Sequence, residues 1–592
     1  MIVPMKKVTI LSLAVHRDEM LGALRDLGAV HVAPLQTQTT GDVESARRQL
    51  DEARAAQAAL ERVAQDSPPS SVGAATGETP DQLLRSTLVL TARLRDRHDR
   101  LQRLDEQIHH LAPLGHFDPA QLRDLNHRGI SIRLFKSEPK AVFTLPPEAV
   151  RVELRRDKSA VHFALINAAG WSDASATEFP LPDRSLADLT HEHDKTAADQ
   201  AEDEAALVSL APHKAALATA IADLASRLHW LETRDGMGAE GPLLLLQGYL
   251  PARDLDRLET VARRRGWGWL AEEPADTDPV PTLIDSPRWI RPVHIMFDML
   301  GILPGYREVD VSPIFLIFFS LFVAMLVGDA VYGLLFLSLT LLIKFKWKAA
   351  PRHLVPLAAI LSVSTIVWGV LTGSYLGFEA IPGPLRALRI DWLTDTTQIQ
   401  KFCFMIGAVH MSIAHGWNVW RLRRQWTALS HVGWIGSCWA MYAFANYLVL
   451  GLPLLPGATA LIGLSVFLIL GFTVPVRDIK KEYASLLTLP LSIISNFGDV
   501  VSYLRLYLVG SASVVLIKAF NGIAFPSDSA NILFTLLGVL IIFAVHILNI
   551  MLSSLAVLVH GVRLNALEFS THMGIQWLGL KYNPFRIRKD TP

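Results

Sequence analysis

The chain has 592 residues, and its 56 lysines and arginines balance its 56 aspartates and glutamates, which argues against a nucleic-acid binder with a globally basic surface. Hydrophobic residues make up 51% and charged residues 19%, a balance too apolar for an ordinary soluble enzyme of this length. The two cysteines, Cys403 and Cys438, form no CxxC pair and cannot build a disulfide framework, so disulfide-stapled extracellular domains and zinc ribbons are excluded.

Charge and hydropathy divide the chain near Asp285. Residues 1–285 hold 43 acidic and 33 basic residues, and residues 286–592 hold 13 and 23, so the two parts carry net charges of −10 and +10. Roughly 20 apolar residues already span a bilayer. Stretches that lack formal charge, apart from Asp329 in the first of them, occur at 313–343, 353–378, 402–420, 431–475 and 529–562.

This division predicts a cytoplasmic arm over residues 1–285, a linker over 286–312 and an α-helical polytopic membrane domain over 313–592. The first 20 residues contain a short apolar run, but acidic and basic residues follow it and no small-residue cleavage site is present. We therefore expect no signal peptide and an N-terminal arm that stays in the cytoplasm.

The arm begins with a strand, a helix and a strand within residues 6–35, and Gly28 is expected to close the helix. Helical segments follow, interrupted by a proline- and glycine-rich stretch at 68–80 and by an α/β insert at about 128–170. Leucine and isoleucine recur at heptad spacing in two segments, with Arg97 interrupting the first: Leu83, Leu90, Leu94, Leu101, Leu104, Ile108 and Leu111, then Leu217, Ile221, Leu224, Leu228 and Leu231. The pattern predicts small α/β domains on an antiparallel coiled-coil hairpin, with two helices of a compact bundle as the alternative.

Basic loops orient the membrane helices, because cytoplasmic loops are enriched in lysine and arginine. Four groups are expected to be cytoplasmic: Lys344, Lys346, Lys348 and Arg352; Arg421, Arg423 and Arg424; Arg477, Lys480 and Lys481; and Lys581, Arg586, Arg588 and Lys589. A single crossing at 313–343 would then place the arm outside the cell. We therefore expect this segment to enter and leave again, bending near Gly328–Asp329, which gives about eight membrane segments with both termini cytoplasmic.

Ionisable residues within apolar spans are the strongest candidates for function, because a charge at membrane depth is costly. Arg505 lies in such a span, and 12 uncharged residues separate it from Lys518. A second long helix carries polar residues within about 140° of one face: His546, Asn549, Ser553, His560, Arg563 and Glu568. The alternative is that the histidines are structural hydrogen-bond donors and that Arg563 reaches the membrane interface.

A buried guanidinium cannot relay a proton, but it can hold a carboxylate ionised. In this chain only Asp499 and Asp329 are expected at a matching depth, so we expect a carboxylate of another subunit to complete the pair. His410 and His415 are five residues apart, which does not align two metal ligands on a helix, so packing or hydrogen bonding is the expected role. No G-x-x-x-x-G-K-[ST] motif occurs, so no P-loop nucleotide site is expected in this chain.

Several motifs together resemble subunit I (subunit a) of V-type and A-type rotary ATPases and ATP synthases, and the likeness extends over nearly the whole chain. The most specific are SYLRLYLVG at 502–510, HGVRLNALEF at 560–569 and LVGDAVYGLLF at 326–336. TGSYLG at 372–377, GAVHM at 407–411, YREVDVSP at 306–313 and QGYLP at 247–251 support them.

The resemblance implies a membrane stator subunit in a prokaryotic plasma membrane, beside a ring of proteolipid (c, or K/L type) subunits that each carry a mid-membrane carboxyl. Arg505 and Arg563 would separate two half-channels, the water-filled paths that lead from either side of the membrane to its middle. Half-channel candidates are Ser553, His560 and Glu568 on the cytoplasmic side, with Asp329, Asp499, His546 and Ser513 as further candidates. The other implied partners are membrane lipid, peripheral-stalk (E/G type) and central-stalk socket (C/d type) subunits, without nucleic acid, cofactor or metal.

This chain departs from many relatives at Ser553 and Ser513, and Asn565 and Ala566 stand where aromatic residues are common. These changes leave open whether H⁺ or Na⁺ is moved. Two other function classes compete with the stator: a secondary ion transporter, which would not account for the large arm, and a membrane-anchored coiled-coil scaffold, which gives no reason for an arginine inside a span.

Overall fold

The computed structural model describes the chain apart from residues 37–39, 67–79, 116, 140, 142, 158–159, 169, 174, 181, 211, 213, 348–352, 379–382, 475–482, 525–531 and 587–592. Most of the predicted break at 68–80 therefore lies outside the described residues, as do seven of the basic loop residues: Lys348, Arg352, Arg477, Lys480, Lys481, Arg588 and Lys589. The contacts divide the chain into two compact units. One holds residues 8–248, 256–270 and 584–592, the other holds residues 1–7, 249–255 and 271–583, and each is described by itself.

The predicted strand, helix and strand are present, and apart from residues 5–7 they belong to the first of these units: β1 (Met5–Leu13), α1 (Arg17–Leu27) and β2 (His31–Ala33). Gly28 closes α1 at φ +63°, a left-handed conformation that glycine adopts without a steric penalty. The sheet has the order β2-β8-β1-β9, with β8 at Leu243–Pro251 and β9 at Gly268–Glu272. A short strand, β7 (Gly238–Glu240), pairs with β8, and α7 (Leu255–Arg265) connects β8 to β9.

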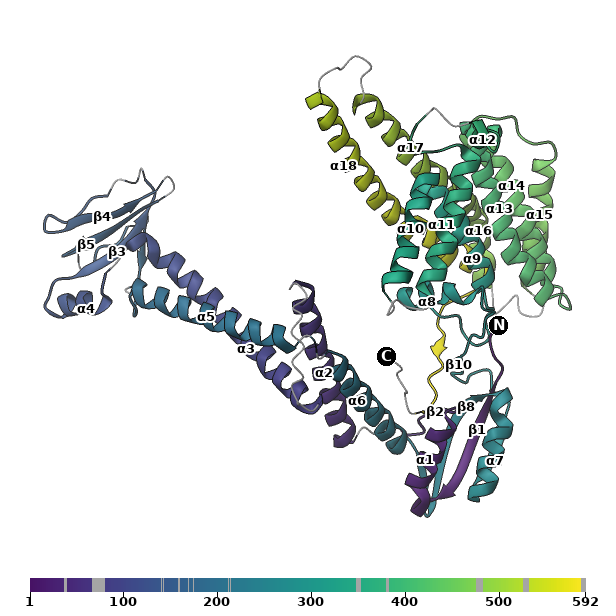
Figure 1. The fold of residues 1–592 in the computed structure, drawn as a ribbon, viewed down its shortest axis with the longest axis horizontal. Coiled ribbons are helices and arrows are strands. Elements are labelled where there is room, and N and C mark those ends of the chain that lie inside the picture. Colours follow the sequence, from purple (N-terminus) through teal and green to yellow (C-terminus); the bar gives the residue numbers. More distant parts are fainter. Residues whose placement is uncertain are drawn as a thin grey trace. The chain divides into compact units, whose positions relative to one another are not determined.

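Four long helices follow in the same unit: α2 (Gly41–Asp66), α3 (Pro80–Leu111), α5 (Leu186–Leu210) and α6 (Lys214–Asp235). α2 packs on α6, and α3 packs mainly on α5 (Figure 1). A core of Leu60, Leu83, Leu207 and Leu217 joins all four helices. The heptad segments lie on α3 and α6, but the acidic helix α5, which has no leucine heptads, is the main partner of α3. The coiled-coil hairpin therefore stays a prediction.

Arg97 interrupts the heptad pattern because it forms an ion pair. Its guanidinium lies 2.8 Å from the carboxylate of Asp203 on α5, and Asp203 is only 7% exposed. Charge at a helix seam is tolerated where an opposite charge compensates its desolvation.

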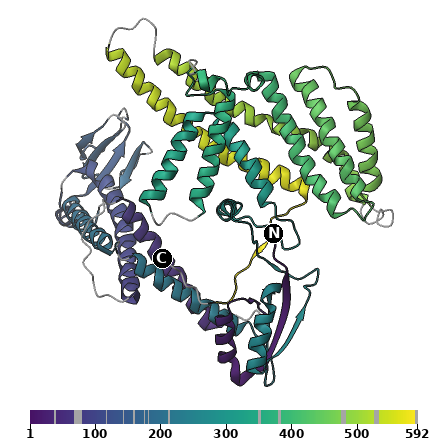
Figure 2. The same ribbon diagram turned by 45° about the vertical axis from the view of Figure 1, so that its right-hand side comes forward.

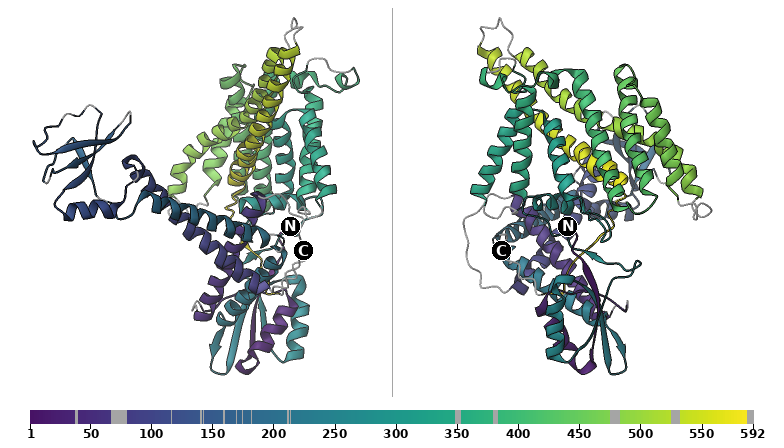
Figure 3. Two further views of the ribbon diagram at one scale, coloured as in Figure 1. Left: turned by 60° about the vertical axis from the view of Figure 1, so that its left-hand side comes forward. Right: turned by 90° about the vertical axis from the view of Figure 1, so that its right-hand side faces the viewer.

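A small antiparallel sheet is inserted between α3 and α5, at the far end of this helix pair (Figure 3). Its order is β4-β5-β3-β6, with β3 at Ile132–Ser137, β4 at Val150–Arg156, β5 at Val161–Ile166 and β6 at Ala176–Phe179. A helix, α4 (Pro119–His127), precedes it. The sheet thus extends past the predicted end of the insert at residue 170.

The other unit contains the apolar helices. Two short strands, β10 (Pro281–Thr282) and β11 (Leu580–Lys581), pair in parallel, followed along the chain from β10 by α8 (His294–Leu300). The longer helices are α9 (Ser312–Val327), α10 (Ala330–Lys346), α11 (Leu354–Thr372), α13 (Thr396–Arg421), α14 (Ala428–Leu450), α15 (Ala458–Phe472), α16 (Tyr483–Ser502), α17 (Leu504–Ala524) and α18 (Ile532–Ala556). Figures 1 and 2 show α17 beside α18 and α14 beside α15, as their contacts require.

Within the described residues, three helical stretches are long and apolar enough to cross a membrane: Leu354–Thr372, Leu487–Ile523 and Leu536–Met573. The pair α9 and α10 makes a fourth if it counts as one span, and it bends by 120°. This bend lies at Gly328 (φ +69°) and Asp329, where the sequence predicts it. The count of eight membrane segments stays a prediction.

Two glycines allow α17 to approach its neighbours closely. A Cβ at Gly510 would lie 2.3 Å from the carbonyl oxygen of Met325 on α9, and a Cβ at Gly407 on α13 would lie 2.7 Å from the ring of Tyr503. Such contacts exclude a larger residue. They fix the start of α17, which carries Arg505.

Candidate functional site

Arg505 lies in the first turn of α17, just after the break that separates α16 from α17 at Tyr503. At this break Tyr503 N bonds the carbonyl of Val500, three residues back, and Arg505 Nε donates to the carbonyl of Ser502 at 2.8 Å. An arginine side chain that bonds a backbone carbonyl three residues before it can adopt only a few rotamers. The helix break therefore orients Arg505.

Glu568 joins the two arginines. Its Oε1 accepts from Arg505 Nη2 at 2.8 Å and lies 3.3 Å from Arg563 Nε. The glutamate side chain is 7% exposed, whereas those of Arg505 and Arg563 are 24% and 55% exposed. One buried carboxylate thus pairs with two partly exposed cations, which offset the cost of its burial, while its Oε2 has no hydrogen-bond partner among the described residues.

This arrangement corrects the expectation that only Asp499 and Asp329 could meet Arg505 from within the chain. The reason is local helix geometry. Residues 557–561 and 564–569 are π-helical, and a π-helix bonds residue i to residue i+5. Arg563 and Glu568, five residues apart, would diverge by about 140° on an α-helix, but the π turn brings them onto one side.

A second set of contacts fixes Tyr503, which lies two residues before Arg505. Tyr503 is fully buried, and its hydroxyl bonds His410 Nδ1 at 2.8 Å. The His410 ring is stacked between Phe318, 3.8 Å away centroid to centroid, and Phe569, 4.3 Å away. The prediction that His410 serves packing or hydrogen bonding is confirmed. Tyr503 was missed by the sequence reasoning, although it lies within the SYLRLY motif.

Ser513 and Ser553 contact each other, with their hydroxyl oxygens 3.5 Å apart. Ser513 is eight residues beyond Arg505, or about 12 Å along α17, on the opposite side of Arg505 from Asp499. Ser553 thus lies beside Ser513 while Glu568 lies beside Arg505, so these two half-channel candidates lie at different levels, and their assignment to one half-channel stays a prediction. His560 lies on the π-helical turn between them, and its Nδ1 is buried with no hydrogen-bond partner among the described residues.

Asp329 is 1% exposed and has a structural role. Its Oδ1 accepts from the amides of Val331 and Tyr332 and so caps α10, and its Oδ2 accepts from Ser374 Oγ and the Leu376 amide. Aspartate is a preferred N-cap residue. These contacts pin the bend between α9 and α10 to the loop after α11.

His546 lies away from the arginines. Its Nδ1 is 2.7 Å from the hydroxyl of Tyr332, which also accepts from Asn549 Nδ2 at 3.2 Å. His546 precedes Glu568 by 22 residues, about 33 Å along the helix axis. The polar residues that the sequence places on one helix face therefore make separate contacts. His546 and Asn549 contact Tyr332, whereas Glu568 contacts the arginines.

Asp499 lies one and a half turns before Arg505 on α16, and its Oδ2 is 3.2 Å from His572 Nε2. His572 belongs to the short helix α19 (Ser570–Met573) and bonds His415, so the prediction of a hydrogen-bonding role for His415 is confirmed. His572 was not among the predicted residues because it follows the last recognisable motif. Among the described residues, no group of three or more histidines, cysteines, aspartates or glutamates is placed to hold a metal ion.

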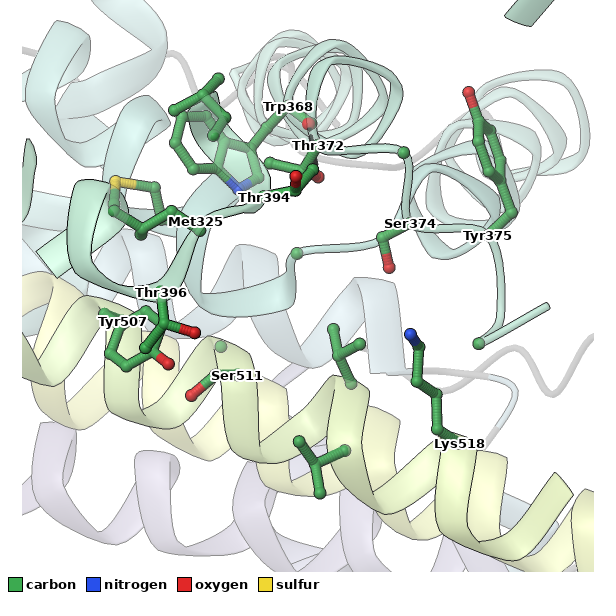
Figure 4. Close-up of a pocket in the computed structure, with 18 of the residues that line it drawn as sticks. Met325, Trp368, Thr372, Ser374, Tyr375, Thr394, Thr396, Tyr507, Ser511 and Lys518 are labelled. Carbon is green, nitrogen blue, oxygen red and sulfur yellow. Dashed lines mark hydrogen bonds between the residues drawn. The ribbon is translucent and has the colours of Figure 1, made fainter. Parts of the chain in front are cut away.

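A cavity of about 510 Å³ lies beside α17 on the side of Arg505 away from Asp499. It follows α17 from Leu506, the residue after Arg505, to Lys518, which is about 18 Å along the helix. Figure 4 shows Ser511 and Lys518 rising from α17 toward this cavity, with Ser374 across from Lys518. The described wall has both polar and apolar side chains and includes Arg389 but no carboxylate.

Known proteins resemble this chain, two of those described below over nearly its whole length. It is 31% identical over 638 residues to V-type ATP synthase subunit I 1 of Treponema pallidum, covering 99% of this chain and 100% of that protein. It is 28% identical over 616 residues to V-type ATP synthase subunit I of Borreliella burgdorferi, covering 100% of each. It is 24% identical over 394 residues to A-type ATP synthase subunit I of Methanocaldococcus jannaschii, covering 58% of this chain and 55% of that protein.

No family model matches the chain. Among solved structures, it is similar to the cytoplasmic N-terminal domain of subunit I, a homologue of subunit a, of V-ATPase, at 14% identity over 45% of this chain and 100% of that one. The TM-score of 0.23 is too low for this likeness to support an argument.

Proposed function

The chain belongs to the family of V-type and A-type ATP synthase subunit I, and we propose that it is the membrane stator beside which a proteolipid ring turns. In this proposal Arg505 and Arg563 face the ring, and each proteolipid carboxyl releases its ion as it meets them. The carboxyl passes the arginines as an anion and then reloads. Ion flow across the membrane is thereby coupled to ATP synthesis or hydrolysis in other subunits.

The observation that carries the proposal is a fixed double positive charge inside an apolar helix pair. Arg505 and Arg563 share one carboxylate, Glu568, so the group of three keeps a net charge of +1. That charge repels a free cation and attracts a carboxylate, and both effects are strong where water is scarce. A site of this kind stops an ion from crossing directly and admits only one that a ring carboxyl carries.

Exposure supports contact with another subunit. Arg505 and Arg563 remain 24% and 55% exposed although Glu568 is buried, so both cations can reach a partner. Apolar side chains around them are exposed as well, including Leu508 on α17 at 52% and Val559 on the π-helical turn after α18 at 48%. A surface of this composition fits a ring of apolar helices or lipid, rather than water.

Access from the two sides is proposed to lie on either side of Arg505 along one helical stretch. Asp499 precedes Arg505 and lies toward the loops that the sequence predicts to be cytoplasmic. The cavity along α17 follows Arg505 and begins at Leu506. We assign the cavity to the half-channel on the non-cytoplasmic side, with Ser511 on its wall.

The first of the two compact units would act as the arm that holds the peripheral stalks against torque. Its helices α3 and α5 are joined by ion pairs such as Arg97 to Asp203 as well as by leucines. In the same proposal the central-stalk socket and membrane lipid are further partners, and the arm and both termini are cytoplasmic.

The test is the variant Arg505→Ala in the complete complex. We expect it to abolish ATP-driven ion pumping while the chain still co-purifies with the proteolipid ring and the nucleotide-binding subunits. Arg263→Ala, which removes an exposed arginine of α7, is the control and should pump normally. Normal pumping by Arg505→Ala would remove this arginine from the mechanism, and failure of the wild-type chain to co-purify with a ring would reject the stator.

The assignment of the cavity has its own measurement. Cys403 and Cys438 are buried, so a single introduced cysteine can be labelled selectively. Ser511→Cys should react with a membrane-impermeant maleimide applied from the non-cytoplasmic side only. Labelling from the cytoplasmic side alone would reverse the assignment.

A further inference from the structure

Four titratable side chains form a continuous hydrogen-bonded chain on one side of Arg505. Asp499 Oδ2 lies 3.2 Å from His572 Nε2, His572 Nδ1 lies 3.0 Å from His415 Nε2, and His415 Nδ1 lies 3.2 Å from His431 Nδ1. The four residues come from α16, α19, α13 and α14. Side chains so far apart in sequence meet here through the packing of these helices.

The middle of this hydrogen-bonded series is buried, whereas the residues at its two ends are partly exposed to solvent. His415 is 4% exposed, and the side chains of His572 and Asp499 are 9% and 31% exposed. His431 is partly exposed and lies in the first turn of α14, beside the loop that follows Arg421. That loop is one of those the sequence predicts to be cytoplasmic.

The contacts around the chain fix its geometry. Trp434 stacks on the ring of His415, with 11° between the planes. Asn418 Nδ2 donates to the backbone carbonyls of His572 and Met573, both at 3.3 Å, and so holds α19 against α13.

We propose that Asp499, His572, His415 and His431 form a proton path on the cytoplasmic side of Arg505, so the ion that this protein moves is H⁺. This inference rests on the proposed stator function and goes beyond it, because it identifies the ion and a route. Both nitrogens of His415 and both of His572 take part in the chain. An imidazole that is bonded through both nitrogens accepts a proton on one and releases a proton from the other.

One transfer balances as follows, and a second can begin once Asp499 has released its proton toward the ring carboxyl and the three imidazoles have returned to their first tautomers. In the resting state His431 donates to His415, His415 to His572, and His572 to the Asp499 carboxylate. A proton that arrives on the free Nε2 of His431 displaces the Nδ1 proton to His415, His415 passes its Nε2 proton to His572, and His572 passes its Nε2 proton to Asp499. One proton has entered and Asp499 is protonated, about 9 Å along the helix from Arg505.

Sodium cannot follow this route. A hard cation is held by several oxygen ligands, such as carboxylates, carbonyls and water. The inner part of the chain offers imidazole nitrogens, and the only carboxylate in it is Asp499 at one end. The same chain that conducts H⁺ therefore excludes Na⁺.

The experiment uses the complete complex in liposomes and measures ATP-driven H⁺ uptake with a pH-sensitive dye and Na⁺ uptake with a radioactive tracer. Wild type should take up H⁺ in sodium-depleted buffer and accumulate no Na⁺. His415→Gln keeps a polar, hydrogen-bonding side chain but cannot exchange protons between two nitrogens. We expect it to lower H⁺ uptake at least tenfold, with partial recovery when imidazole is added.

His294→Gln is the matched control, because His294 is a partly buried histidine on α8 that bonds Ser286 Oγ at 3.1 Å and lies outside this chain. If His415→Gln does not assemble with the ring, His431→Gln serves in its place, since His431 is partly exposed. Wild-type uptake by an assembled chain variant, or tracer Na⁺ accumulation by the wild type, would overturn the inference. Loss of pumping in Arg505→Ala together with normal pumping in His415→Gln would leave the stator function intact and reject the proton path alone.

Discussion

Replacing Glu568 by glutamine removes the charge that holds Arg505 and Arg563 together while it keeps the size of the side chain. A buried hydrogen bond to a charged group contributes about 1.5–3 kcal/mol, and the 2.8 Å contact with Arg505 is of this kind. The contact with Arg563 adds little, because that arginine is 55% exposed and solvent screens the pair. We therefore expect Glu568→Gln to lower the local stability of the π-helical turns that follow α18 by about 2–3 kcal/mol.

Amide hydrogen exchange measures this loss directly, because exchange reports local opening. At about 1.4 kcal/mol per factor of ten, the protection of amides in residues 557–573 should fall roughly 30- to 140-fold. Asp391→Asn is the matched control, since Asp391 also faces an arginine, at 3.6 Å, but is 95% exposed. We expect no measurable change in that variant.

The double variant Arg505→Gln/Glu568→Gln separates pairing from packing. It should recover part of the lost protection, because neither charge is then left without its counterion. If Glu568→Gln changes protection no more than the control does, the carboxylate does not hold the arginines and the reasoning about their geometry is refuted.

Three further predictions concern other parts of the chain. Gly510→Ala should lower the melting temperature of the protein in detergent by several degrees, because its Cβ would lie 2.3 Å from a backbone oxygen of α9. The control Gly522→Ala, whose Cβ would have no atom within 4 Å, should leave the melting temperature unchanged. Equal melting temperatures of the two variants would disprove the close approach. Burial, and then the cation of Lys136, which is paired with His162 on the neighbouring strand β3, lower the pKa of His162. The strand β5 should therefore lose exchange protection as the pH falls below about 6.5, where the unfolded histidine binds its proton first; a flat profile, or the same profile in His162→Gln, would contradict this. Arg97→Leu should destabilise the arm by about 3 kcal/mol although it completes the heptad, because Asp203 loses its partner, and Arg97→Leu/Asp203→Leu should melt at or above the wild type.

Much of the architecture follows from local sequence signals. The strand, helix and strand at the N-terminus and the glycine that closes α1 are confirmed, and so is the bend at Gly328 and Asp329. Each depends on a nearby residue type with one strong conformational preference. Glycine supplies a positive φ, and aspartate caps the helix that follows.

The site was predicted less completely, because its geometry depends on long-range packing and on a change of helix type. A rotation of 100° per residue separates Arg563 from Glu568, and nothing in the sequence announces the π-helical turns that reunite them. His572 and His431 come into contact with His415 only because α13, α14 and α19 pack together, and the sequence does not indicate this packing. Likewise, the acidic helix α5 carries no leucine heptad, so its packing on α3 was invisible to a search for apolar repeats.

The proposed mechanism depends most on Arg505 facing a rotating partner, and cross-linking tests this contact directly. Leu508 lies one turn beyond Arg505 and is 52% exposed, and Phe467 on α15 is 66% exposed as a control. Leu508→Cys should form a disulfide with a cysteine placed beside the mid-membrane carboxyl of the proteolipid, and the cross-link should block ATP-driven rotation, while Phe467→Cys should not cross-link. A cross-link through position 467 with none through position 508 would contradict the account.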